Sequence, residues 1–162
     1  MASDAYLRFD GIKGESQDHA HKEWIEISGV RWAIQQPKSA TASTAGGHTA
    51  ERAELSEVSF EKLCDLSSPI LMQTCAMGKT IPKATLEFMR ADGDGNPIKY
   101  FEIELDNVLI GTISPILGVG ILQEIIGLKF SQVRWRYTQQ RIAGSSAGNT
   151  AGGWNLATNR PA

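Results

Sequence analysis

The sequence lacks the features that mark several specialised classes of protein. Only 2 of its 162 residues are cysteines, Cys64 and Cys75, so no disulfide framework is expected and both are interpreted as free thiols. It has no basic excess either, since its formal net charge is −2, which argues against non-specific binding to nucleic acid. The opening residues 1–7 contain no basic and no long apolar stretch, and we therefore expect no signal peptide. Together these absences favour a soluble protein of the cytosol.

Long hydrophobic runs are also scarce, and the one candidate is interrupted. Residues 110–128 are rich in Ile, Leu and Gly, and a membrane-spanning helix needs roughly 20 mostly apolar residues. Pro115 interrupts the run, Glu124 places a charge inside it, and four glycines weaken any helix. We expect a strand, a loop and a second strand here, with no insertion into a membrane.

Catalytic and nucleotide-binding motifs are absent from the sequence. It contains no Walker loop, no GxSxG and no HExxH. Gly118 and Gly120 are not followed by the third glycine of a dinucleotide-binding fingerprint. Nothing in the sequence therefore favours an enzyme or a bound cofactor.

Metal sites are no better supported. Residues 92–96 (DGDGN) resemble the start of a calcium loop, but Pro97 stands where such a loop needs glycine and Ile103 where it needs a glutamate. A hairpin turn explains the same residues. The histidines lie in predicted loops without further ligands at metal-binding spacing, and we interpret them as surface residues: His19, His21 and His48.

The residues that are present fit one β-rich domain spanning residues 1–162. Hydrophobic residues make up 41% of the chain and charged residues 21%, which is enough apolar material for a core. Ser67, Pro69 and Gly78 bracket apolar residues at helical spacing and predict one helix over about residues 69–77. Two Gly/Ser-rich stretches are expected to form a flexible loop at about residues 37–50 and an extended C-terminal tail at about residues 141–162. Strands are expected at residues 6–9, 24–35, 53–63, 84–89, 100–113 and 125–137.

The apolar pattern of the long predicted strands changes phase midway. The change falls at residues 28–29, at residues 106–107 and at residues 131–132. A one-residue slip in a period of two indicates a bulge or a strand that changes its buried face. Three such strands predict a mainly β fold, a small bent-strand β-barrel of two sheets with one flanking α-helix. Partial burial of both strand faces, which would blur the phase, is the alternative.

Charge is unevenly distributed along the chain. Residues 1–65 contain seven basic and eleven acidic side chains, whereas the residues after Glu124 contain five basic and no acidic ones. An acidic face and a basic face on one chain would suit head-to-tail self-association, which forms rings or filaments. Ordinary solvated strand faces would give the same pattern, so both interpretations stand.

Several stretches, none specific alone, combine into a recognisable pattern. They are residues 1–16 with their IKGES ending, 24–27 (WIEI), 60–79 (FEKL to MGK), 128–137 (LKFSQVRWRY) and 153–159 (GWNLATN). Together they resemble the hemolysin-coregulated proteins (Hcp), the tube-forming component of bacterial type VI secretion systems. The resemblance covers essentially the whole chain.

The resemblance implies a fold similar to that of phage tail-tube proteins and a structural role. In this family, subunits assemble head-to-tail into hexameric rings, and the rings stack into a tube inside contractile sheath proteins. A spike protein caps the tube, and small effector proteins occupy its lumen. The implied localisation is the bacterial cytoplasm, followed by secretion through the type VI apparatus. No catalytic, cofactor or metal residues belong to the family pattern.

Candidate contact residues follow from the charge pattern and the resemblance. Arg31 is expected to face the lumen, at a position where family members often have a small polar residue. The apolar segment 115–122 replaces a Gly- and polar-rich loop of the family, and we expect it to pack against a neighbouring subunit or ring. The residues expected in contacts between subunits or rings are Pro37, Ser39, Thr41, Ser43, Gly46, Gly47, Glu54, Glu57, Glu61, Ile116, Leu117, Arg134 and Arg136. A phage-like tail-tube subunit and a small ligand-binding β-barrel are the alternative functions.

Overall fold

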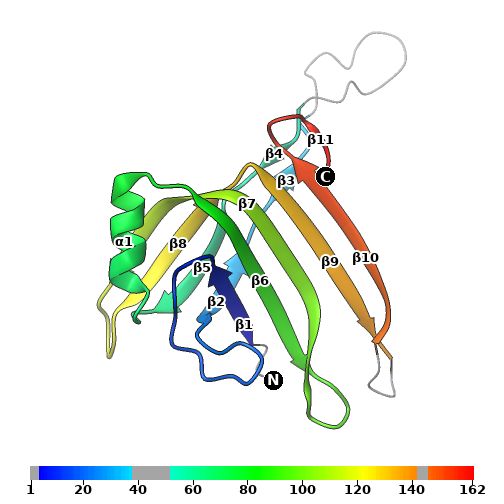
Figure 1. Ribbon diagram of the computed structural model, residues 1–162, viewed down its shortest axis with the longest axis horizontal. Coiled ribbons are helices and arrows are strands. Elements are labelled where there is room, and N and C mark those ends of the chain that lie inside the picture. The colour runs from blue at the N-terminus through cyan, green and yellow to red at the C-terminus, as the bar shows by residue number, and fades with distance from the viewer. Residues whose placement is uncertain (1–3, 38–51, 142–145) are drawn as a thin grey trace.

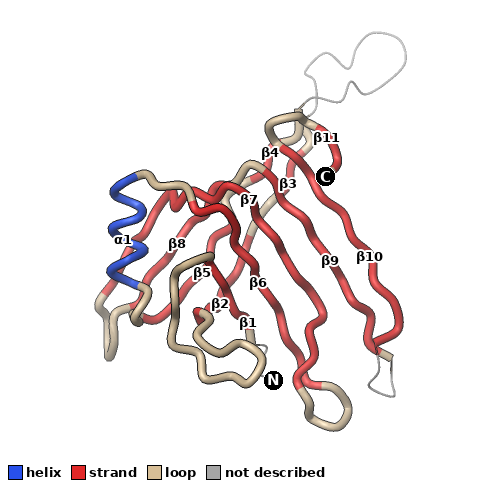
Figure 2. Tube along the Cα trace, viewed as in Figure 1, coloured by secondary structure: helices blue, strands red, loops and turns tan. Residues whose placement is uncertain are grey.

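The computed structural model describes residues 4–37, 52–141 and 146–162 as a mainly β structure (Figures 1 and 2). Strands predominate among the described residues, and a helix lies on the flank of the sheets (Figure 2). In chain order the elements are β1 (Ala5–Phe9), β2 (Ile25–Arg31), β3 (Ile34–Gln35), β4 (Glu54–Leu55), β5 (Val58–Leu63), α1 (Ser68–Met77), β6 (Ile81–Ala91), β7 (Pro97–Ile116), β8 (Gln123–Lys129), β9 (Gln132–Gln140), β10 (Ser146–Asn155) and β11 (Arg160–Pro161).

Six strands close into a barrel, and three extend beyond it. The strand order is β11-β10-β9-β7-β6-β1-β2-β5-β8, and an additional pairing of β7 with β8 closes the circle. Strands β9, β10 and β11 therefore continue the sheet outward from β7 as a projecting extension, visible on the right of Figure 1. The expected fold class, a bent-strand barrel with one flanking helix, is confirmed.

Strand β7 makes the corner that joins the two sheets of the barrel. Its first half pairs with β9 over residues 101–106, and its second half pairs with β8 over residues 109–116. Between them Asn107 has a φ of 52°, a left-handed conformation that asparagine tolerates better than most residues. A register shift follows between Ile110 and Thr112. The phase change expected at residues 106–107 is thus a real bend, and Figure 1 shows β7 curving across the top of the barrel.

The other two phase changes have different causes. In β2 the register shifts between Ser28 and Arg31, and Gly29 has a φ of 58°, so the bulge expected there is confirmed. At residues 131–132 the expectation is wrong, because the chain leaves β8 at Lys129 and begins β9 at Gln132. The expected strands 24–35 and 53–63 are also each divided in two, into β2 and β3 and into β4 and β5.

The barrel interior is filled by side chains from all six of its strands. The largest fully buried residues are aromatic and branched aliphatic, among them Phe9, Phe60 and Leu105. Trp32 lies at one end of this core, stacked at 6.0 Å between ring centroids on Phe101. The described strands thus fill the barrel interior with side chains, in contrast to a ligand-binding barrel, whose interior encloses a cavity.

Helix α1 matches its predicted start and end. Pro69 occupies its first turn, and Gly78 ends it in a left-handed conformation with a φ of 63°. Leu71 and Thr74 are buried against the barrel, where the helix contacts β7. Ile70, expected on the same apolar face, is instead 47% exposed, because the helix turns it toward solvent.

The two Gly/Ser-rich stretches differ in outcome. Of the expected flexible loop, only Pro37 falls within the described residues, and residues 38–50 lie outside them. The expected C-terminal tail contains β10, which pairs along β9 with Gly152 opposite Trp135 and Trp154 opposite Val133. Its small residues therefore extend the sheet instead of leaving it.

Candidate functional site

The part of the chain that the structure describes contains no candidate metal site. Within residues 4–37, 52–141 and 146–162, no group of three or more His, Cys, Asp or Glu side chains is arranged so that it could hold a metal ion. Within the same ranges, no helix is both long and apolar enough to cross a membrane. Asp92 forms the expected turn: its carboxylate accepts hydrogen bonds from the backbone amides of Asp94 and Asn96, which lower its pKa.

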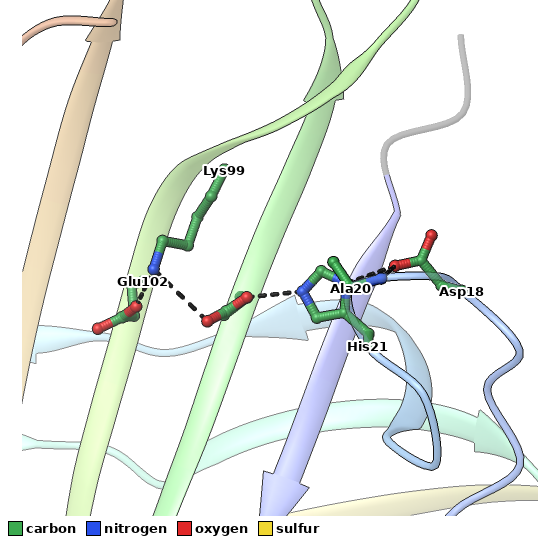
Figure 3. Close-up of polar contacts among 6 residues, drawn as sticks. Asp18, Ala20, His21, Lys99 and Glu102 are labelled. Atoms are coloured by element: carbon green, nitrogen blue, oxygen red, sulfur yellow. Dashed lines mark hydrogen bonds and ion pairs between the residues drawn. The ribbon is translucent and has the colours of Figure 1, made fainter.

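His21 is not the surface residue that the sequence indicated. It is 1% exposed, and its ring lies between two carboxylates, with Nδ1 2.6 Å from Asp18 and Nε2 2.6 Å from Glu87 (Figure 3). The ring also stacks on Tyr6 at 4.2 Å between centroids and meets Trp24 edge-on. Each ring nitrogen that carries a proton can therefore donate to the carboxylate it faces.

The same cluster shifts the pKa values of its neighbours. The hydrogen bond from His21 lowers the pKa of Asp18 more than desolvation raises it. Burial, and then the nearby Asp18 carboxylate, raise the pKa of Tyr6 to about 12. The cluster therefore ties the loop before β2 to β1 and β6 through charge as well as through ring packing.

Lys99 extends this cluster onto β7. Its ammonium bonds Glu102 and lies 3.5 Å from Glu87, the carboxylate that also contacts His21 (Figure 3). Burial by itself raises the pKa of Glu102, but the Lys99 ammonium lowers it further, so the net shift is downward. Burial likewise opposes the charge on Lys99, yet the two carboxylates raise its pKa overall. We call Asp18, His21, Glu87, Lys99 and Glu102 the rim network.

A second ion network is fully buried. The side chains of Lys62 on β5 and Glu124 on β8 are 0% and 1% exposed and lie 2.6 Å apart. Lys62 also contacts Asp65 at 3.0 Å and Ser68, the first residue of α1, at 2.9 Å. Ser68 donates to the same Glu124 oxygen at 2.9 Å. This buried network fixes the start of α1 to both β5 and β8.

The predicted acidic contact residues lie along β4, β5 and the link between them, with Glu54 on β4, Glu57 in the link and Glu61 on β5. Glu54 and Glu61 are exposed, whereas Glu57 is half-buried because its carboxylate lies over two glycines, Gly111 and Gly127. A Cβ at Gly127 would come within 2.2 Å of that carboxylate, so the absence of a side chain there accommodates it. Lys129 lies 4.0 Å from Glu57 and partly offsets its charge.

The predicted basic contact residues differ in how far they are already paired. Arg134 on β9 contacts Glu104 at 3.5 Å and Asp106 at 3.2 Å on the adjacent β7. Arg136, two residues along β9, is exposed. Arg134 is thus already paired with carboxylates of its own subunit. Arg136 is the better placed of the two for a contact with another subunit.

The apolar segment after β7 is exposed in the isolated subunit. Ile116, Leu117 and Ile121 are 58%, 68% and 54% exposed. Arg31 at the end of β2 is also exposed, which leaves its expected orientation toward a lumen a prediction. The remaining predicted contacts fall outside the described residues: Ser39, Thr41, Ser43, Gly46 and Gly47.

The alternation of residues along β5 and β8 could have predicted the buried network from the sequence. Lys62 has the same parity as the buried Val58 and Phe60, and Glu124 has the same parity as the buried Ile126 and Leu128. Alternation therefore places both charges on the inner face of their strands. For His21 no comparable signal exists, because its partner Glu87 is 66 residues away.

Comparisons with known proteins agree with this architecture. Residues 6–137 match the family model described as "Type VI secretion system effector, Hcp". The chain belongs to the Hcp family. Protein hcp1 of Pseudomonas aeruginosa is 34% identical over 162 residues, which is 98% of both chains. As an Hcp protein, the chain functions as a tube protein of the type VI secretion system, in a family of structural secretion proteins that is not a known enzyme family.

Solved Hcp structures match over nearly the full length. A structure titled as a type six secretion system protein superposes with a TM-score of 0.91 at 27% identity, covering 99% of this chain and 100% of that one. Hcp1 from Salmonella typhimurium superposes with a TM-score of 0.81 at 30% identity, and the match covers 100% of both chains. The strands outside the barrel and the flanking helix are thus included in the similarity.

Proposed function

We propose that this chain assembles into homohexameric rings that stack into the inner tube of a type VI secretion system. Membership of the Hcp family across residues 6–137 is the observation that carries this proposal. The packed barrel interior supports it, because a hollow conduit must then form between subunits and not within one. Uneven charge and an exposed apolar segment supply unlike surfaces, which a closed ring of head-to-tail contacts requires.

The proposal extends to the partners of the tube. Contractile sheath proteins would surround it, a spike protein would cap it, and small effector proteins would travel in its lumen. The protein would be made in the bacterial cytoplasm and leave through the apparatus. Sheath contraction would drive its expulsion, so the subunit would need no nucleotide or metal of its own.

Particle mass tests the ring directly. Size-exclusion chromatography with light scattering should give a mass about six times the 17.6 kDa of the chain at micromolar concentration. Charge-screening salt should shift the dissociation of the particle, because unlike charges contribute to head-to-tail contacts. A monomer at all concentrations would contradict the ring and favour a monomeric barrel instead.

A phage-like tail-tube subunit would also form rings, so particle mass does not separate it. Export does. In a bacterium with an active type VI system, this protein should appear in the culture medium, and deletion of the sheath gene should abolish its release. Release that does not depend on the sheath would contradict the secretion function while leaving the ring intact.

A further inference from the structure

Strand β10 has an open edge that lacks the usual protection. It pairs with β9 on one side, whereas on its other side β11 reaches only Trp154 and Asn155. Among the described strands, none pairs with that outer edge over residues 148–152. These five residues are exposed and have small side chains, without the lysine or proline that commonly blocks an edge. Such an edge accepts another strand or segment readily.

Positive charge and an aromatic ring lie beside this open edge. Arg136 and Tyr137 project from opposite faces of β9, and both are exposed, Tyr137 by 40%. Glu102 of β7 lies opposite Arg136 and offsets part of its charge. Arg141 follows at the end of β9 and Arg160 begins β11, and they add positive charge at the two ends of the edge. We call residues 136–141 and 148–152 the β10 edge surface.

The complementary chemistry lies at the turn between β7 and β8. Ile116, Leu117 and Ile121 are exposed there, and the backbone amide of Cys64 donates to Leu122 at 2.9 Å, which holds the turn beside the end of β5. Leu63, 53% exposed, joins the same apolar surface. We call these four apolar residues the hairpin patch.

The hairpin patch borders an acidic cleft. Leu63 and Ile121 line a cleft of about 360 Å³ together with three carboxylate residues, Glu15, Glu26 and Asp65. Lys62 also lines it, but its ammonium is already paired with Asp65 and Glu124. The surface as a whole is therefore apolar with a negative border, which suits a partner that is aromatic and positive.

The two surfaces lie on opposite sides of the subunit. In Figure 1 the turn between β7 and β8 lies at the lower left, below α1, whereas β9 and β10 form the right-hand side. They cannot meet within one chain. We propose that the hairpin patch of one subunit packs against the β10 edge surface of the next, so that a second copy of this chain occupies each surface. This inference rests on the proposed function and adds to it which surfaces make the contact within a ring.

Site-specific cross-linking tests the contact. A photoreactive benzoylphenylalanine is introduced at Leu117 in a mixture of unlabelled and ¹⁵N-labelled chains, and the cross-linked peptides are identified by mass spectrometry. Products joining residue 117 of one copy to residues 136–141 or 148–152 of another are expected. The matched control places the same group at Met77, which is 65% exposed, close to the 68% of Leu117, at the far end of α1. It should give no such product.

The outcomes separate this contact from the proposed function. A ring of the expected mass whose Leu117 products map to another part of the neighbour, or to no copy of the chain, would overturn the contact alone. A chain that stays monomeric would overturn the proposed function and this contact with it.

A pair of substitutions provides an independent test. Leu117→Asp with Ile121→Asp should raise the concentration at which rings dissociate by about tenfold or more, because buried apolar contacts dominate interface energy. Both residues are exposed in the subunit, so its denaturation midpoint should stay unchanged. Met77→Asp is the control and should leave ring dissociation unaffected. Equal dissociation of all three proteins would contradict the contact.

Discussion

The subunit contains two ion networks that join distant segments, and they differ in exposure. Lys62 and Glu124 are no more than 1% exposed, whereas in the rim network the Lys99 side chain is 35% exposed, and the carboxylates it contacts, those of Glu87 and Glu102, are 18% and 9% exposed. Both contain a lysine and carboxylates, and each ties three elements together. The comparison therefore isolates the effect of burial on similar chemistry.

Burial changes what each network contributes. A buried pair carries a large desolvation cost, so it stabilises the fold little in total but becomes very costly when one partner is removed. A pair whose lysine is partly exposed has a smaller desolvation cost and tolerates the loss of a partner better, since water reaches the site and replaces it. We therefore expect the buried network to control whether α1 docks on the barrel, and the rim network to adjust stability with pH.

The largest effect is expected from Lys62→Met. The substitution leaves Glu124 charged, buried and without its cation, which should lower the free energy of unfolding by about 3–5 kcal/mol. Urea denaturation followed by circular dichroism measures this. Lys129→Met, which removes a 62% exposed lysine 4.0 Å from Glu57, is the matched control and should change stability by about 1 kcal/mol or less. Similar losses of stability in Lys62→Met and Lys129→Met would contradict the expected effect of burial.

His21→Ala should have the next largest effect. It removes the stack on Tyr6 and both hydrogen bonds, leaving Glu87 short of a donor, and should cost about 2–4 kcal/mol. His19→Ala, at an exposed position in the same loop, is the control and should be nearly neutral. If the His21→Ala variant unfolds at the same urea concentration as the wild type, the rim network does not hold the loop before β2 in place.

The double variant Lys62→Met with Glu124→Leu sharpens the comparison. Replacing both charges removes the desolvation cost together with the attraction, so stability should return to within about 2 kcal/mol of the wild type. The same denaturation experiment gives the coupling energy between the two positions. A double variant as unstable as Lys62→Met alone would show that the loss comes from packing around α1 and not from an unpaired charge.

The smallest effect is expected from Lys99→Met, and it should depend on pH. Because the pKa of Glu102 is lowered in the folded protein, its stabilisation is present above the ordinary carboxylate range and is lost as pH falls through the lowered pKa. The wild type should exceed the variant by about 1 kcal/mol or less near pH 7, and the difference should shrink below about pH 4. Urea titrations at several pH values measure it, and a difference that grows on acidification would contradict the assignment.

Local alternation was sufficient to predict most of the barrel. The phase changes at residues 28–29 and 106–107 indicated a bulge and a corner because a strand with one buried face cannot slip by one residue without bending. The prediction of one bent strand from the third phase change was wrong, because alternation alone does not distinguish a bent strand from two strands joined by a short turn. At residues 130–131 the chain makes that turn.

Composition alone does not predict strand β10 at the C-terminal end of the described chain. Gly, Ser and Ala in residues 146–153 indicated a tail, since they contribute little to a core. Their strand conformation depends on pairing with β9, a contact of tertiary structure that lies outside local propensity. The rim network was unpredictable for the same reason, because Glu87 reaches His21 only after β6 pairs with β1.

Electron microscopy of the purified protein tests the central claim most directly, namely that this chain works as one unit of a hollow conduit. We predict that end-on class averages show closed rings of six equal units around an open centre, and that side views show stacks of such rings at high protein concentration. Compact particles of single-subunit size, with no central opening at any concentration, would contradict the account.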